Sequence, residues 1–216
     1  MKLSDLLNII ELTTFVIGLI TFKKYKDTYL KYFLFLLGLI VALEYGVLAL
    51  KKLYGSNFQN HFIYNISTSI QYIYYFTLYY RTLNKVKYKK LVAGFLAFFL
   101  ISIIFNFSFT QKLNVDGPFH SYTFTLGAVL LIVSIGLFFA EMLKTEKVLR
   151  FRSYLMFWIS IGLFLFYTAI IPLILSINFL PMSLEPKMLR AILFVLNLMM
   201  YGCFSIGFIV SDKQSN

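Results

Sequence analysis

Acidic residues are scarce in this sequence, and most of the few it has lie outside its apolar segments. Only nine of 216 residues are Asp or Glu, against twenty Lys or Arg, and charged residues make up 13% of the chain. A soluble domain carries about 25% charged residues. With 60% hydrophobic residues, a soluble fold of this length would need to bury more apolar surface than one small core holds. The composition therefore excludes an ordinary soluble domain.

Cysteine and histidine are also scarce, and their scarcity excludes several kinds of chemistry. The single cysteine, Cys203, rules out an internal disulfide and a Cys-Cys redox pair. A zinc-dependent membrane hydrolase needs several His and carboxylate ligands, and this chain has two histidines, His61 and His120. The sequence also contains no Gly-x-Ser-x-Gly elbow and no phosphate-binding loop. We therefore predict no metal site.

Two chemistries that occur inside membranes lack their key residues as well. An intramembrane aspartyl protease needs two embedded aspartates, but Asp5, Asp27, Asp116 and Asp212 all lie at segment ends or in loops. A retinal protein needs a lysine in the middle of its seventh span, where this chain has only Lys187 at the very start. We predict that the protein is not an enzyme and binds no cofactor.

What the sequence does contain is seven long apolar segments joined by short connections. Each has about the 20 residues that a helix needs to cross ~30 Å of hydrocarbon. No linker, low-complexity tract or repeat divides the chain. We therefore predict one all-α integral membrane domain over residues 1–216, a seven-transmembrane helix bundle in a lipid bilayer. The expected spans are residues 4–22, 29–50, 59–80, 91–110, 121–141, 154–177 and 187–210.

The loops between these segments differ in basic charge, which predicts the orientation of the chain. On one side they carry six basic residues: Lys2, Lys51, Lys52, Lys112, Lys187 and Arg190. On the other they carry fourteen: Lys23, Lys24, Lys26, Lys31, Arg81, Lys85, Lys87, Lys89, Lys90, Lys144, Lys147, Arg150, Arg152 and Lys213. Because cytoplasmic loops are the basic ones, we predict N-outside and C-inside. This topology accounts for the net charge of +11 without nucleic acid. We expect a multi-pass protein of the bacterial inner membrane.

Two carboxylates lie well inside the apolar segments, at matching depths. Glu11 is about 10 Å from the outer end of the first segment, and Glu44 is about 9 Å from the outer end of the second. A carboxylate in hydrocarbon costs roughly 2.5–3.5 kcal/mol on insertion scales, so it normally faces a partner or a cavity. We therefore predict that both face the interior of the bundle and have a functional role.

Other polar residues share helical faces with these carboxylates. Their spacings of three, four and seven residues place each set on one stripe, and such a stripe faces the bundle because lipid cannot satisfy it. We predict a polar pocket that opens outward, bounded by the first, second, third and seventh segments. Its candidate residues are Glu11, Glu44, Asn65, His61, Asn197, Tyr201, Asn8 and Arg190.

Structural interpretations of the same residues stand beside the pocket. The Asn and Tyr side chains are better explained as hydrogen bonds between helices, worth ~0.6 kcal/mol each. His61 lies two residues into its segment and is better explained as a wet interfacial side chain. Arg190 lies close enough to the outer end to reach the headgroups.

Two segments in the last third of the chain also carry a resemblance. Phe157 to Gly162 reads FWISIG, and Ile192 to Phe208 reads ILFVLNLMMYGCFSIGF. Together they resemble small seven-transmembrane proteins of Bacteroidota, which are often encoded near signalling histidine kinases. The resemblance implies a role in sensing or signalling and assigns no residue to it.

Three functions remain open from the sequence. The first is a sensor or receptor-like signalling module, which binds a small molecule from the outer side and acts on a membrane or cytoplasmic signalling protein. The second is a small-solute or proton-coupled transporter, with Glu11 or Glu44 carrying the proton. The third is a structural subunit of a membrane complex. A transport path usually carries polar groups along its length, and the inner halves of these segments are apolar, which favours the sensor.

Overall fold

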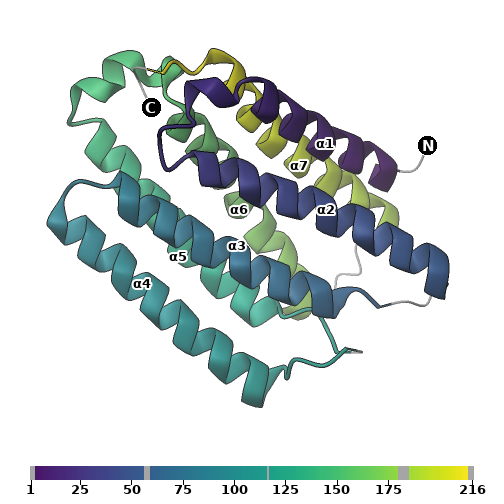
Figure 1. Ribbon diagram of the computed structural model, residues 1–216. Coiled ribbons are helices and arrows are strands. Elements are labelled where there is room, and N and C mark those ends of the chain that lie inside the picture. Colours follow the sequence, from purple (N-terminus) through teal and green to yellow (C-terminus); the bar gives the residue numbers. More distant parts are fainter. Residues whose placement is uncertain (1–2, 56–58, 116, 180–184, 214–216) are drawn as a thin grey trace. The chain divides into compact units, whose positions relative to one another are not determined.

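A computed structural model describes residues 3–55, 59–115, 117–179 and 185–213 of the chain. Within these ranges the protein is helical and contains no strand, and each predicted apolar segment contains one α-helix (Figure 1). The all-α prediction is therefore confirmed. The helices are α1 (Leu3–Ile20), α2 (Lys31–Tyr54), α3 (His61–Thr82), α4 (Val86–Phe105), α5 (Ser121–Met142), α6 (Leu155–Phe179) and α7 (Pro186–Val210).

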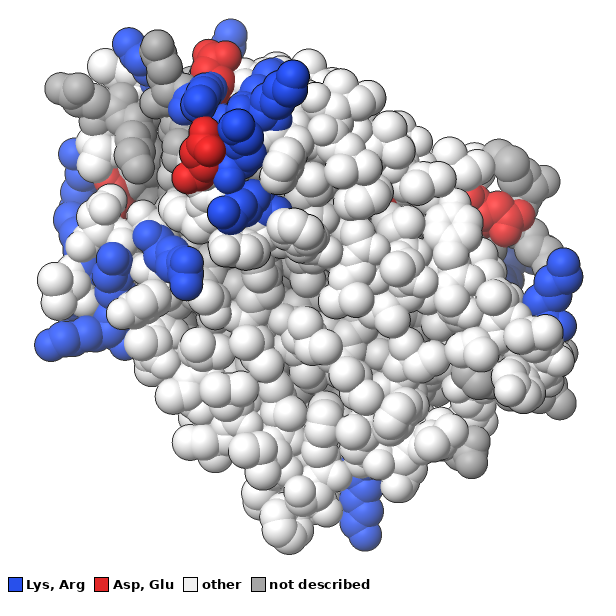
Figure 2. All heavy atoms as spheres, viewed as in Figure 1, with Lys and Arg blue, Asp and Glu red and all other residues white. Residues whose placement is uncertain are grey.

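Five of the described helices are long and apolar enough to cross a membrane. They are α2, α4 with its continuation to Thr110, α5, α6 and α7. These are the helices of a multi-pass α-helical membrane protein. Helix α3 is not among the five, because its Asn, Ser, Gln and Tyr side chains lower its mean hydropathy, and α1 is not among them either. In Figure 2 the charged side chains gather in patches and leave wide uncharged stretches of surface.

The chain forms two compact units, and the division falls within α2 between Val41 and Ala42. The first unit contains α1, the first part of α2, α6 and α7. The second contains the rest of α2 together with α3, α4 and α5, and it ends at Glu141. The single membrane domain expected for residues 1–216 stays a prediction.

In the first unit, α7 packs against both α1 and α6. The Thr14 hydroxyl of α1 lies 3.0 Å from the Ser205 hydroxyl of α7. One turn further along both helices, a side chain added at Gly18 would meet the ring of Phe208. These two contacts advance in the same direction, so α1 and α7 run parallel.

Aromatic rings fill the space between α7 and the start of α2. The rings of Phe33 and Phe204 meet edge to face with 5.0 Å between centroids, and those of Tyr25 and Phe208 lie 5.4 Å apart. All four side chains are buried. The Tyr25 hydroxyl donates to the Gly18 carbonyl, so this buried ring also has its polar atom satisfied.

In the second unit, α3, α4 and α5 run alternately up and down, and α3 packs against α4. Tyr72 of α3 is fully buried at their centre. Its ring contacts Phe99 of α4 and Phe124 of α5, with centroid distances of 5.2 and 6.0 Å. Its hydroxyl donates to the Phe124 carbonyl at 2.9 Å. One residue therefore links all three helices.

Helix α4 does not end as a regular α-helix. It continues as η2 (Asn106–Thr110), a wider π-helical turn. The backbone N–H groups of Gln111 and Lys112 both donate to the Asn106 carbonyl at 3.1 Å, and Lys112 adopts a left-handed conformation with φ of 42°. Such π turns are rare and are frequently found at functional sites.

Candidate functional site

Besides Arg190, four of the predicted pocket residues belong to the α1–α7 pair of the first unit. Asn8 and Glu11 of α1 are buried, each with 8% of the side chain exposed, and Tyr201 of α7 is buried as well. Asn197 is half-buried, and its amide donates to the Leu193 carbonyl of its own helix at 2.8 Å.

The parallel packing of α1 and α7 brings part of this set to one level. The Thr14 hydroxyl contacts Ser205 and lies 3.4 Å from the Tyr201 carbonyl. Glu11 is one helical turn before Thr14, as Tyr201 is one turn before Ser205. Glu11 and Tyr201 therefore lie at the same height along the two helices.

The remaining predicted residues have different surroundings. Glu44 is half-buried and accepts a hydrogen bond from the Tyr64 hydroxyl at 2.8 Å, which joins α2 to α3. His61, at the start of α3, is exposed, and so is Arg190, near the start of α7. The predicted pocket draws on both compact units, and as a whole it stays a prediction.

Asn65 is buried and fixes the segment that leads into α5. Its amide nitrogen donates to the Pro118 carbonyl at 3.0 Å, and its amide oxygen accepts from the His120 backbone N–H at 2.9 Å. This side chain holds the approach to α5 against α3. Its arrangement agrees with the structural interpretation of the asparagines.

His120 lies beside these hydrogen bonds of Asn65 and is only 3% exposed. Its ring meets the Phe107 ring edge to face at 5.0 Å. Among the described residues, neither ring nitrogen makes a hydrogen bond. Burial lowers the pKa of His120, and the nearby backbone of Lys112 and Gln111 opposes that shift without removing it. The ring therefore takes up a proton only at a lower pH than an ordinary histidine does.

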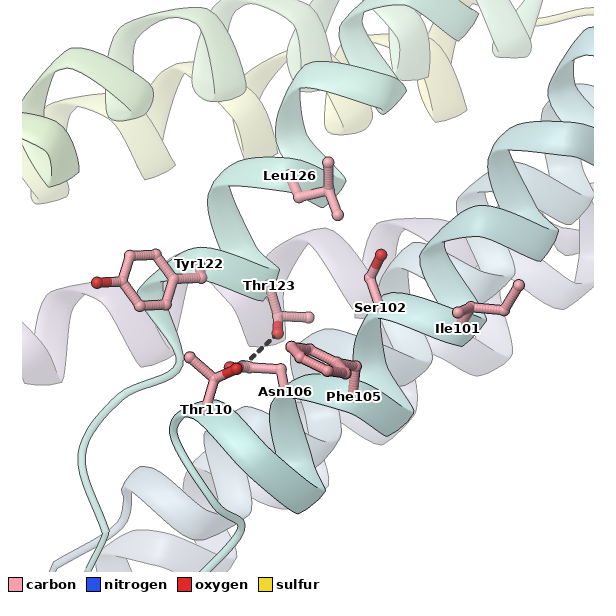
Figure 3. Close-up of a pocket in the computed structure, with 8 residues that line it drawn as sticks. All are labelled: Ile101, Ser102, Phe105, Asn106, Thr110, Tyr122, Thr123 and Leu126. Atoms are coloured by element: carbon pink, nitrogen blue, oxygen red, sulfur yellow. Dashed lines mark hydrogen bonds between the residues drawn. The ribbon is translucent and has the colours of Figure 1, made fainter.

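A pocket of about 390 Å³ opens nearby, between the end of α4, the π turn η2 and the start of α5 (Figure 3). We call it the α4–α5 pocket. Its walls combine apolar and hydroxyl-bearing side chains, and none of them is charged. The lining residues are Ile101, Ser102, Phe105, Asn106, Thr110, Tyr122, Thr123 and Leu126.

Asn106 is the buried polar residue of this pocket, with 5% of its side chain exposed. Its amide nitrogen donates to the Thr123 hydroxyl at 2.6 Å (Figure 3) and to the Gln111 side-chain oxygen at 3.1 Å. Its amide oxygen is buried and has no hydrogen-bond partner among the described residues. An unpaired buried acceptor costs free energy that a donor from a bound molecule would recover.

The opposite end of the second unit contains a carboxylate that is fully paired. Glu141, 5% exposed, accepts hydrogen bonds from the Asn84 backbone and side chain at 2.7 and 3.0 Å, and from the Lys85 backbone at 3.1 Å. These donors precede α4, where the helix dipole favours a negative charge. Glu141 therefore closes the turn between α3 and α4.

Sequence reasoning overlooked Asn106, His120 and Glu141. His120 and Glu141 lie at the ends of an apolar segment, where a polar side chain is ordinary. The one available signal was the asparagine at 106, which precedes the end of its segment by a full turn.

A comparison with protein families, curated proteins and solved structures finds no match to this chain.

Replacing Glu141 by Ala leaves the amides of Asn84 and Lys85 without their acceptor, so we expect a loss of about 1–3 kcal/mol in stability. Thermal unfolding in detergent measures it. Glu185→Ala is the control, because Glu185 is exposed and its side chain makes no capping hydrogen bond to α7. Equal changes in the two variants would contradict the role given to Glu141.

The buried ring of His120 predicts a pH-dependent stability. In the unfolded chain His120 takes up a proton near its ordinary pKa of about 6.5, whereas in the folded chain it does so only at lower pH. The free energy of unfolding should therefore fall as the pH drops below about 6.5, by at most ~1.4 kcal/mol per pH unit. We expect His120→Phe to remove this slope and His61→Phe, at the exposed histidine, to keep it. Unfolding midpoints measured between neutral and mildly acidic pH test this prediction.

Proposed function

We propose that this chain is a seven-span membrane protein, N-outside and C-inside, that acts as a sensor or receptor-like signalling module. Its ligand is a small uncharged molecule bound near the outer face. The observation that carries this proposal is the α4–α5 pocket, where a buried amide oxygen of Asn106 has no donor among the residues that the structure describes. The resemblance of the last third to small seven-transmembrane proteins adds the expectation of a signalling partner in the membrane or cytoplasm.

The proposed orientation puts the pocket close to the outer surface. Helix α4 then runs outward and α5 runs inward, so the end of one and the start of the other meet on the outer side. Asn106 precedes Thr110, the last residue of the apolar stretch, by four residues or about 6 Å. A ligand therefore has a short path to it.

The same two helices connect the pocket to the inner side. At that end Glu141 of α5 holds the turn that begins α4, through Asn84 and Lys85. A ligand that moves α4 against α5 at the pocket therefore shifts the hydrogen bonds that hold this turn. The turn lies among the basic residues of the segment 81–90. Coupling through two packed helices of this kind needs only a small shift. Transport and a purely structural role stay as the alternatives predicted from the sequence.

The orientation is tested by single cysteines in a Cys203→Ser background. Asn114, in the loop after η2, and Lys87, in the first turn of α4, are both exposed, and the proposed orientation puts them on opposite sides of the membrane. We expect Asn114→Cys to react with a membrane-impermeant maleimide in intact cells, and Lys87→Cys to react only after permeabilisation. The reverse pattern would overturn the orientation, and with it the outer position of the pocket.

The sensor is separated from the transporter by proton flux in reconstituted vesicles. With an imposed pH gradient and an internal pH-sensitive dye, we expect no flux above that of empty vesicles, because the proposed function needs none. Steady flux that disappears in Glu11→Gln or Glu44→Gln would support the transporter instead. Asn114→Ala, an exposed loop variant, serves as the control for reconstitution.

A further inference from the structure

We infer that the α4–α5 pocket binds a neutral, hydroxyl-bearing lipid that enters from the membrane rather than from water. This inference rests on the proposed function, since it names the class of ligand for the same pocket. It follows from where the pocket opens, from how its polar and apolar residues are arranged, and from the absence of charge among its eight lining residues.

The walls of the pocket belong to a surface that faces away from the core. Ile101 and Phe105 of α4 are 66% and 60% exposed, and Tyr122 of α5 is 53% exposed. Ile104 and Phe109 continue the same apolar surface, with 65% and 70% exposure. On a membrane-spanning helix such a surface contacts acyl chains. The pocket is therefore open to lipid along α4.

The pocket is polar near the end of α4 and the start of α5, and it is apolar about one helical turn deeper. Asn106, Thr110 and Thr123 lie toward the end of α4 and the start of α5, and the close-up in Figure 3 places Asn106 against Thr123. Ile101 and Leu126 lie about one helical turn deeper. Ser102 is also at the deeper level, but its hydroxyl already donates to the Phe98 carbonyl at 2.8 Å. A lipid has the same order, with its polar group above its chains.

The polar level also lies at the right depth for such a molecule. Thr110 is the last residue of the apolar stretch and Asn106 lies about 6 Å inside it, so the polar level begins at the edge of the hydrocarbon core, where the headgroup region starts. The hydroxyl of a neutral lipid occupies this boundary. A volume of about 390 Å³ is near the lower limit for small-ligand sites, so it takes the head and the upper chain while the rest lies along α4.

The chemistry of the lining selects the headgroup. Asn106 carries a buried amide oxygen without a hydrogen-bond partner among the described residues, and the hydroxyls of Thr110 and Thr123 can accept or donate. A lipid hydroxyl satisfies both kinds of group at once. The lining contains no Lys or Arg to bind a phosphate and no Asp or Glu to bind an ammonium group. A charged headgroup would therefore be desolvated there without compensation.

The test uses the full chain in phosphatidylcholine nanodiscs and a diacylglycerol probe with a photoreactive group on its acyl chain. Four unlabelled compounds are tested as competitors in separate arms: dioleoylglycerol, its acetyl ester, dioleoylphosphatidate and water-soluble glycerol. The amount of probe attached to peptides from the end of α4 and the start of α5 is measured by mass spectrometry. We expect dioleoylglycerol to compete at least about tenfold better than the acetyl ester, and phosphatidate not to compete.

Variants connect this binding to the pocket. Asn106→Leu removes the acceptor and should weaken attachment about tenfold. Leu126→Trp fills the deeper level while leaving the Asn106 hydrogen bonds intact, so it keeps the test decisive if Asn106→Leu does not fold. Asn114→Ala, outside the pocket, should bind like the parent. Thermal midpoints in the same nanodiscs confirm that each variant is folded.

Each other outcome has a defined meaning. Equal competition by the acetyl ester or by phosphatidate would overturn the inference that a neutral hydroxyl is recognised. Competition by glycerol at the same site would overturn entry from the membrane and leave the proposed function standing. No attachment at α4 or α5 and no competition by glycerol would overturn both the lipid and the pocket as a ligand site.

Discussion

Hydrocarbon supplies no hydrogen bonds, so every polar group on a membrane-spanning helix has to be satisfied by the protein itself. In this chain that requirement governs both ends of the α3–α4–α5 unit. At one end Glu141 receives three donors from the turn before α4. At the other, Asn65 binds both Pro118 and His120. Between them Tyr72 directs its hydroxyl to a backbone carbonyl of α5. The helices are held in register by polar groups that have few alternative hydrogen-bond partners.

Against this background, the groups that lack a partner are informative. The oxygen of Asn106 and the ring nitrogens of His120 are buried without hydrogen bonds within the described part of the chain. Both lie around the π turn that ends α4. Glu141 demonstrates that the same fold can satisfy a far more demanding group, a carboxylate, completely. These atoms lie at one irregular π turn beside a pocket, and such turns are frequently found at functional sites.

The sequence predicted those features that depend on neighbouring residues. Long apolar segments become helices because length and composition act locally, and stripes spaced by three and four residues placed Glu11 and Asn65 in buried positions. The features it missed depend on distant partners. Glu141 and Asn84 are 57 residues apart, Asn106 and Thr123 are 17 apart. No periodic pattern within one helix reveals such a pair.

Glu44 is another residue whose hydrogen-bond partner the sequence did not predict. Its depth identified it as a carboxylate in need of a partner, but the partner, the Tyr64 hydroxyl, is 20 residues away on the next helix. Tyr64 was not among the predicted residues, because tyrosines are abundant along α3 and none stands out by position. The sequence therefore identified Glu44 as a residue that needs a partner. Which residue supplies the hydrogen bond depends on how the helices pack.

We infer that the amide oxygen of Asn106, which is buried without a hydrogen-bond partner among the described residues, takes up a donor from a membrane lipid. The most direct measurement is the chemical shift of its side-chain carbonyl carbon, by solid-state NMR of asparagine-labelled protein in phosphatidylcholine bilayers. Loss of the signal in Asn106→Leu assigns it. The account predicts the shift of a carbonyl without a hydrogen bond, which moves to higher frequency when dioleoylglycerol is added. A carbonyl that is already hydrogen-bonded, and whose shift the lipid leaves unchanged, would contradict it.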